Sequence, residues 1–389
     1  MTEEMVQMML ALVRSAMGGE PLTEAQRQAC TPEVCRGVMR LAEKHDLKHL
    51  VADAMVKQQL MDDPDGRLKK AVYLAIYRHQ RLEYVGKQTA AILETAGIPF
   101  LPLKGSVIRS RYPQPWMRTS CDLDILVHPE DLEKAVAALV TQGGFENKGR
   151  GYHDVTLKAP NGATVELHFS LLEDGRFPKA EAIMEQVWAH AAPVREGSME
   201  HRMSDEMFLF HHILHMAYHI KEGGCGIRPF LDLWLLGREE NREPREALLE
   251  AGGLLAFART AADLAAVWFS EMPHRDMTRN LEHYILRGGV FGTAGNQAAM
   301  NQANTGGNAI TSRIFLSPEI LRGHYPVLER HGWLMPFCQV ARWFRLLSPQ
   351  RLRRAVKMVK ADASTTTDQY TAAADLLHHL ELEDSKPMT

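Results

Sequence analysis

A strand-like segment, Asp122-Leu-Asp-Ile-Leu-Val, interrupts a chain whose other patterns are mostly helical. Its polar and apolar residues alternate with a period of two, as in a strand with one buried face. Two more alternating runs follow, Asp154 to Lys158 and Thr164 to Phe169, and Pro160-Asn161-Gly162 between them predicts a hairpin turn. The short apolar run from Ile98 to Leu103 contains two prolines and predicts an edge strand. Together these runs predict a small mixed sheet in the middle of the chain.

Helical patterns lie on both sides of this sheet. Apolar residues recur at helical spacing before residue 97, and they do so again after about residue 198, for example from Asp205 to Lys221. We therefore expect an α+β fold with three parts: an N-terminal helical region (1–96), an α/β core with a mixed sheet (97–197) and a C-terminal helical region (198–389). A segment rich in Gly, Asn and Gln, from Gly288 to Asn308, predicts a loop.

Composition narrows the class of protein. The 389 residues carry a formal net charge of −3, which is neither the strongly basic charge of many nucleic-acid-binding proteins nor the bias of a disordered chain. The five cysteines are scattered without a CxxC pair, which is typical of reduced thiols in the cytoplasm. The acidic N-terminus lacks the basic region of a signal peptide, and no apolar run has the length of a membrane span. We expect a cytoplasmic protein without a membrane span.

The alternating strands bring carboxylates together. Asp122 and Asp124 are two residues apart, so their side chains project from the same face of the strand. Glu166 and His168 share a face in the same way, and a neighbouring strand would bring Glu166 beside the aspartates. Two carboxylates this close repel each other unless a cation lies between them, and Mg²⁺ (or Mn²⁺) prefers such oxygen ligands. Asp122, Asp124 and Glu166 therefore predict a two-metal site for phosphoryl transfer.

A second group of residues predicts phosphate binding. Gly105 and Ser106 begin a short helical pattern, and the free N–H groups at the start of a helix favour phosphate. Glycine permits close approach of the backbone, and Ser106 adds a hydroxyl donor. Lys104 and Arg118 flank this region and carry the positive charge to meet a triphosphate.

These residues resemble a known pattern. The chain is similar to the nucleotidyltransferase superfamily, with its polymerase-beta-like fold. More closely, it resembles an uncharacterised bacterial nucleotidyltransferase-like family in five segments: Leu103-Lys-Gly-Ser, Tyr112-Pro, Arg118, Cys121-Asp-Leu-Asp-Ile-Leu-Val and Val165-Glu-Leu-His. The resemblance implies transfer of NMP from an NTP such as ATP, with Asp122, Asp124 and Glu166 as catalytic metal ligands. The resemblance does not identify the acceptor, which could be a small molecule, a protein side chain or RNA.

Three other features have a functional and a structural interpretation. His211, His215 and His219 recur every four residues on one predicted helix, so they are candidates for a zinc hydrolase site, for lining the cleft with His168, or for packing, which is favoured. Asp232 has a histidine or Arg228 as candidate partner, and a structural ion pair is the favoured role.

A non-catalytic module that binds nucleotide or a partner on the same fold is the alternative to an enzyme.

The basic stretch near the C-terminus gives the third feature. It runs from Arg342 to Lys360 and includes Trp343 and Phe344. Binding to RNA or to an anionic membrane is one interpretation. A solvated basic helix face, with Trp343 and Phe344 anchored in a core, is the favoured one.

Overall fold

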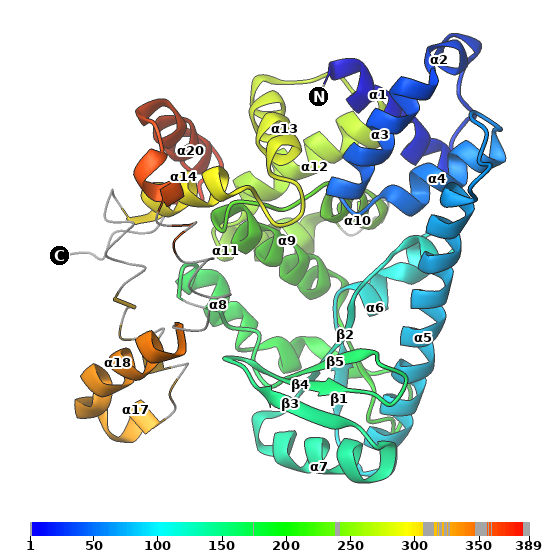
Figure 1. The fold of residues 1–389 in the computed structure, drawn as a ribbon. Helices are drawn as coiled ribbons and strands as arrows, with labels where there is room; N and C mark the ends of the chain where they lie inside the picture. The colour runs from blue at the N-terminus through cyan, green and yellow to red at the C-terminus, as the bar shows by residue number, and fades with distance from the viewer. Residues whose placement is uncertain are drawn as a thin grey trace.

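The computed structural model describes residues 2–173, 175–237, 242–305, 315–316, 318, 321–322, 325, 327–346, 356, 358 and 360–383. Figure 1 shows a small sheet with α7 on its outer side and α9 on its inner side. The long helix α5 runs beside the sheet and continues upward to the other N-terminal helices. This arrangement confirms the predicted α+β fold with helical regions before and after a mixed sheet.

The N-terminal region is helical throughout, as its periodicity predicts. Threonine side chains at residues 2, 23 and 31 accept backbone hydrogen bonds at the starts of the first three helices, which satisfies free N–H groups there. Gly97, with φ of 62°, ends the longest helix in a conformation that favours glycine. The helices are α1 (Glu3–Ala16), α2 (Glu24–Ala29), α3 (Pro32–Lys44), α4 (Lys48–Lys57) and α5 (Arg67–Thr95).

The sheet has five strands in the order β1-β2-β5-β4-β3. β2 and β5 are parallel, and the other neighbours are antiparallel, so the sheet is mixed. β1 lies at one edge, as its prolines predict. The strands are β1 (Phe100–Pro102), β2 (Asp122–Val127), β3 (Glu146–Arg150), β4 (Asp154–Lys158) and β5 (Thr164–His168); between β1 and β3 lie α6 (Gly105–Ile108), η1 (Arg109–Arg111), η2 (Pro115–Met117), η3 (Pro129–Asp131) and α7 (Leu132–Gly143).

The described part of the C-terminal half contains helices and a small two-stranded sheet of β6 (Ala191–Pro193) and β7 (His201–Met203). Its helices are α8 (Pro178–Met184), α9 (Asp205–Lys221), α10 (Arg228–Leu236), α11 (Arg242–Ala251), α12 (Leu255–Ser270), α13 (Asp276–Gly288), α14 (Ala294–Thr305), α17 (Val327–Arg330), α18 (Met335–Leu346) and α20 (Thr367–His379); η4 (Val187–His190) and η5 (Gly332–Leu334) are short 3₁₀ turns. No helix among the described residues is long and apolar enough to cross a membrane.

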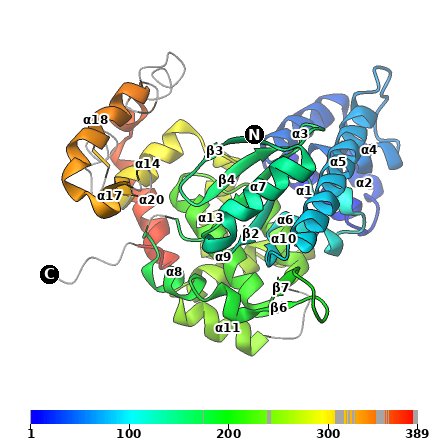
Figure 2. The same ribbon diagram turned by 90° about the horizontal axis from the view of Figure 1, so that it is seen from below.

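Each face of the main sheet packs against a separate apolar core. Seen from below, α7 lies over the sheet (Figure 2). The first core joins this outer face to α5 and α7 through side chains such as Leu123 and Ile125. The second core contains Leu126 from the opposite face, together with buried residues of the N-terminal helices and of α9, α10 and α12. The even-numbered positions of β2 therefore face the C-terminal helices rather than α5 and α7.

Two sequence predictions are wrong here. Helix α14 occupies most of the segment from Gly288 to Asn308 that predicts a loop, because Ala298, Ala299 and Met300 are buried against neighbouring helices; residues 306–308 lie outside the described residues. Phe344 is 68% exposed, so it is not a core anchor. Of the basic stretch, Arg351, Arg353, Arg354 and Lys357 lie outside the described residues.

Candidate active site

The parallel pairing of β2 and β5 positions the central carboxylates. Asp124 is the register partner of Glu166, and Leu126 is the partner of His168. Leu126 belongs to the core on the α9 side of the sheet, and side chains two residues apart share a face. Asp122, Asp124, Glu166 and His168 therefore project toward the C-terminal helices.

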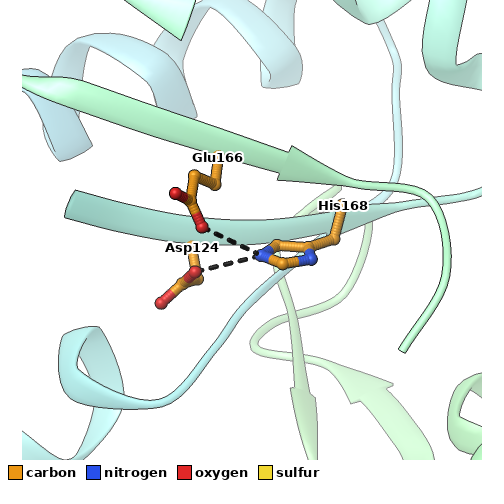
Figure 3. Close-up of side chains that lie close together, drawn as sticks. All are labelled: Asp124, Glu166 and His168. Carbon is orange, nitrogen blue, oxygen red and sulfur yellow. Dashed lines mark hydrogen bonds and ion pairs between the residues drawn. The ribbon is translucent and has the colours of Figure 1, made fainter. Parts of the chain in front are cut away.

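Asp124, Glu166 and His168 form a compact cluster (Figure 3). One potential ligand atom from each lies within 4.8 Å of the others. His168 Nε2 is 3.0 Å from Asp124 Oδ1 and 3.9 Å from Glu166 Oε2. Asp124 and His168 are buried, whereas Glu166 is partly exposed, so the cluster is open to solvent on the Glu166 side. Carboxylate oxygens with an imidazole nitrogen suit a divalent cation.

The ring of His168 orients Asp124. An ionised carboxylate only accepts hydrogen bonds. His168 Nε2 therefore carries a hydrogen and donates a hydrogen bond to Asp124. His168 Nδ1 is buried without a hydrogen-bond partner among the described residues, and the ring stacks on His153 with centroids 5.3 Å apart. This packing fixes the ring plane, and through it the direction of the Asp124 carboxylate.

Lys104 reaches the same carboxylate from the other side. Its backbone has φ of 45° and ψ of −119°, a conformation that non-glycine residues rarely adopt and that is often found at functional sites. Its Nζ lies 3.7 Å from Asp124 Oδ1. Burial alone would raise the pKa of Asp124, but the charge of Lys104 and the hydrogen bond from His168 outweigh it and hold that pKa well below its usual range. Asp124 is thus a permanent anion.

The other two carboxylates, Asp122 and Glu166, have pKa values that are raised. Burial, followed by repulsion from Asp124 and Asp122, raises the pKa of Glu166 to about 7. Burial and the charge of Asp124 also raise the pKa of Asp122. Asp122 lies outside the three-residue cluster but close enough to feel its charge. Such a concentration of carboxylates favours binding of a cation.

The burial and repulsion that raise the pKa of Glu166 predict a change in stability for Glu166→Gln. The folded-state pKa of about 7 lies above the usual 4.5, so the metal-free protein loses stability as pH rises between these values. The neutral variant does not share that loss, and at pH 8 we expect it to be more stable by on the order of 1–3 kcal/mol. Urea unfolding with a chelator at pH 5 and pH 8 measures this difference. Glu133→Gln, at an exposed position of α7, is the matched control, and an identical pH profile in wild type and Glu166→Gln would contradict the assignment.

Only part of the group of residues predicted to bind phosphate is free to contact a ligand. The N–H and the hydroxyl of Ser106 both donate to the carbonyl oxygen of Leu103, so they close the turn that precedes α6. Gly105 is closely packed, because a Cβ atom there would lie 3.2 Å from Nη1 of Arg118. Phosphate binding by Gly105 and Ser106 stays a prediction, and Lys104 is the cation that reaches the cluster.

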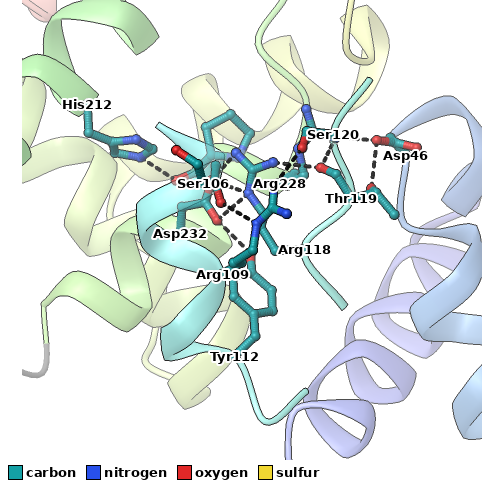
Figure 4. Close-up of polar contacts among 12 residues, drawn as sticks. Asp46, Ser106, Arg109, Tyr112, Arg118, Thr119, Ser120, His212, Arg228 and Asp232 are labelled. Carbon is teal, nitrogen blue, oxygen red and sulfur yellow. Dashed lines mark hydrogen bonds and ion pairs between the residues drawn. The ribbon is translucent and has the colours of Figure 1, made fainter. Parts of the chain in front are cut away.

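Arg118 belongs to a buried polar network (Figure 4). Its Nε donates to both carboxylate oxygens of Asp232 at 2.9 Å, and Nη2 lies 2.8 Å from Asp232 Oδ2. The Tyr112 hydroxyl donates to Asp232 Oδ1 at 2.6 Å, and Arg118 Nη1 donates to the Thr119 carbonyl at 2.7 Å. Asp232 thus pairs with Arg118, while Arg228 pairs with Asp46. The guanidinium predicted to meet phosphate instead joins the loop before β2 to α10.

Histidines of α9 lie above the cluster. Burial and the nearby charge of Lys104 lower the pKa of His211 to about 3 and that of His219 to about 4, and the pKa of His215 falls for the same reasons. These rings are therefore neutral at pH 7. The metal-ligand group found within the described part of the chain contains neither His215 nor His219. This result does not support a zinc hydrolase centre, and a lining or packing role for these histidines stays a prediction.

Sequence reasoning named His211 only as part of the same four-residue repeat as His215 and His219, and it did not identify His153. The charge of Asp124 acts on His211, which places this histidine near the cluster. His153 precedes β4 in a loop and carries no motif, so only the folded sheet places it against His168.

A comparison with known families agrees with this geometry. A family model described as "Uncharacterised nucleotidyltransferase" matches residues 34–270, more than half of the chain. The chain belongs to this family. No curated protein and no solved structure matches the chain.

The nucleotidyltransferase match extends from α3 to α12. It therefore includes the five-stranded sheet, the carboxylate cluster and the α9 helix that faces it. The resemblance seen in the sequence is confirmed, and membership of this nucleotidyltransferase family supports a general role in nucleotidyl transfer.

Proposed function

We propose that the protein is a metal-dependent enzyme that transfers NMP from an NTP to a hydroxyl or similar group of an acceptor and releases pyrophosphate. The observation that carries this proposal is the pairing of Asp124 with Glu166 on parallel neighbouring strands, beside Asp122 and Lys104. Three carboxylates on one face of a sheet concentrate negative charge that a divalent cation would neutralise.

Each residue of the cluster has a role in this proposal. Asp122, Asp124 and Glu166 hold Mg²⁺ or Mn²⁺, and when bound these ions neutralise phosphate charge and lower the pKa of the attacking hydroxyl. His168 keeps the Asp124 carboxylate in one orientation. Lys104, which is partly exposed, meets the triphosphate, with Gly105 and Ser106 as further candidates. The proposed nucleotidyltransferase unit comprises residues 97–197 between helical regions 1–96 and 198–389.

One observation favours a second candidate function. Lys104 and His168 already neutralise and hydrogen-bond Asp124, so part of the cluster is satisfied by the protein's own cation and donor. A non-catalytic module that binds nucleotide or a partner, without turnover, would have this property. Metal-dependent turnover separates the two functions.

Calorimetric titration with each of the four NTPs, with and without Mg²⁺, tests the proposal. We expect one NTP or more to bind only with Mg²⁺, because the carboxylates repel the triphosphate until a cation neutralises them. The Asp122→Asn/Asp124→Asn variant should lose this Mg²⁺-dependent binding, with an affinity at least about 10-fold weaker. NTP binding that is equal with and without Mg²⁺, and unchanged in the variant, would favour the non-catalytic module.

A further inference from the structure

We infer that the exposed face of α5, with the basic cavity beside its first turns, binds single-stranded nucleic acid, specifically RNA. The role of this RNA as the acceptor of the transfer reaction rests on the proposed function. Binding of RNA to the surface does not depend on it. Helix α5 has three features that such a ligand would use: an aromatic stripe, a local excess of positive charge, and a cavity that adjoins the loop before Asp122.

Three tyrosines form the stripe. Tyr73, Tyr77 and Tyr84 are 66%, 58% and 64% exposed, which is unusual for large aromatic side chains on one helix. Offsets of four and eleven residues place them within about 40° of one another around the helix, and over a length of about 16 Å. The guanidinium of Arg81 lies 5.9 Å from the centroid of the Tyr77 ring. Exposed rings in a row, with an arginine among them, are a surface on which nucleobases stack.

The charge of α5 complements a phosphate backbone. The helix carries six basic residues and two acidic ones, a net charge of +4, in a chain whose formal net charge is −3. The basic residues are Arg67, Lys69, Lys70, Arg78, Arg81 and Lys87. This local excess of positive charge favours a polyanionic occupant over a basic or apolar partner, and the exposed rings favour an occupant that carries bases.

A cavity of about 360 Å³ lies between α4, the first half of α5 and the loop before β2. Lys48, Arg67, Lys70 and Arg78 line it, and Glu43 and Asp46 are its acidic members. Among the described residues, the side chains of Lys70 and Arg78 have no hydrogen-bond or ion-pair partner, so their charges are available to a ligand. Lys70 lies between the tyrosine stripe and this cavity on the helix surface.

The cavity leads toward the carboxylate cluster. Thr119 lines it and precedes Asp122 by three residues, which limits the distance between their Cα atoms to about 11 Å. Asp46, also in the wall, pairs with Arg228 and accepts a hydrogen bond from Thr119 at 3.1 Å. A strand bound along the tyrosines, with a phosphate in the cavity, would therefore have its end close to Asp122.

Fluorescence anisotropy of the full chain with a labelled single-stranded RNA of about 16 nucleotides tests the inference, in buffer without NTP or divalent metal. We expect Tyr73→Ala/Tyr77→Ala/Tyr84→Ala to weaken binding at least about 100-fold, because each stacked base is lost. Phenylalanine at all three positions retains the rings and should remain within about threefold of wild type. Circular dichroism of each variant verifies that α5 stays folded.

The charge contribution is tested by Lys70→Glu/Arg78→Glu. We expect at least a ~10-fold weaker affinity and a slope of log K against log salt that is smaller by about 1.4, for two lost phosphate contacts. Lys179→Glu/Arg279→Glu changes the charge by the same amount on α8 and α13, and it should bind like wild type. Equal losses in both pairs, or unchanged binding by the alanine variant, would overturn the inference.

Two further arms identify the ligand and separate the two proposals. Binding of RNA but not of the duplex of the same sequence supports the stacking surface, and single-stranded DNA measures the contribution of the 2′-hydroxyl. No binding of either single strand by wild type would refute the surface and favour a protein partner. Asp122→Asn/Asp124→Asn should bind RNA as wild type does, so failure of the metal site leaves this result unaffected.

Discussion

Asp122→Asn is expected to lower the rate of nucleotidyl transfer by at least about 10³-fold, which corresponds to about 4 kcal/mol of transition-state stabilisation. The substitution preserves the shape of the side chain and removes the charge that a cation requires. The rate is measured as pyrophosphate release from the NTP that calorimetry identifies. Full activity in a well-folded variant would contradict the assignment of Asp122.

The same substitution should not weaken the fold. Burial and the charge of Asp124 raise the pKa of Asp122, so its ionised form is disfavoured in the metal-free protein. Asparagine relieves this repulsion, and we expect a melting temperature equal to or above that of wild type at pH 8. Asp124→Asn differs, because it leaves Lys104 and His168 without their anionic partner. A loss of activity together with an unchanged or raised melting temperature therefore distinguishes Asp122→Asn from Asp124→Asn.

Asp154→Asn is the matched control for this prediction. Asp154 is the register partner of His168 on β4, and its charge contributes to the raised pKa of Glu166, but it lies outside the three-residue cluster. Its loss removes a carboxylate from the neighbourhood without removing a proposed metal ligand. We expect transfer within about 10-fold of wild type, whereas an equal loss in both variants would indicate a general electrostatic effect.

Local pattern was sufficient to predict the strands that carry the cluster. The alternation in β2 and β5 exists because one face of each is buried under α5 and α7, and that same alternation puts Asp122, Asp124 and Glu166 on the other face. β3 was missed because all five of its residues are exposed, so burial leaves no period of two in its sequence. Helix α14 was missed because packing outweighs the weak helix propensity of its Gly and Asn residues.

Pairings over long sequence distances could not be predicted from the sequence. Asp232 is 114 residues from Arg118, and a nearer arginine, Arg228, is the obvious local partner. The choice between them depends on how α10 packs against the loop before β2, which no local pattern encodes. The cluster was predictable because neighbouring strands have a fixed register, whereas the Arg118 network required the tertiary fold.

Arg118→Ala is expected to lower the free energy of unfolding by about 3–5 kcal/mol, the range for breaking a buried ion pair by removing one partner. Asp232 is fully buried and would keep its charge with only the Tyr112 hydroxyl and more distant cations to stabilise it. Urea unfolding at pH 7 measures the loss. Arg259→Ala, which breaks the more exposed pair with Glu246, is the control and should cost at most about 1 kcal/mol.

The conservative variant Arg118→Lys distinguishes geometry from charge. Lysine retains the positive charge but cannot reproduce the planar donor arrangement that holds both Asp232 oxygens and the Thr119 carbonyl at once. We expect an intermediate loss of stability, because the charge remains compensated while some hydrogen bonds are lost. Stability equal to wild type in both Arg118 variants would show that the network contributes little to folding.

These variants also separate two roles for Arg118. If the guanidinium mainly joins the loop before β2 to α10, Arg118→Ala lowers stability, and NTP affinity measured well below the unfolding temperature changes little. If the guanidinium turns to the triphosphate, affinity falls by about 10-fold or more, and stability changes by less than the cost of a broken buried pair. The four contacts of Arg118 with Asp232 and Thr119 favour the first outcome, since binding phosphate would leave the Asp232 carboxylate buried without its guanidinium partner.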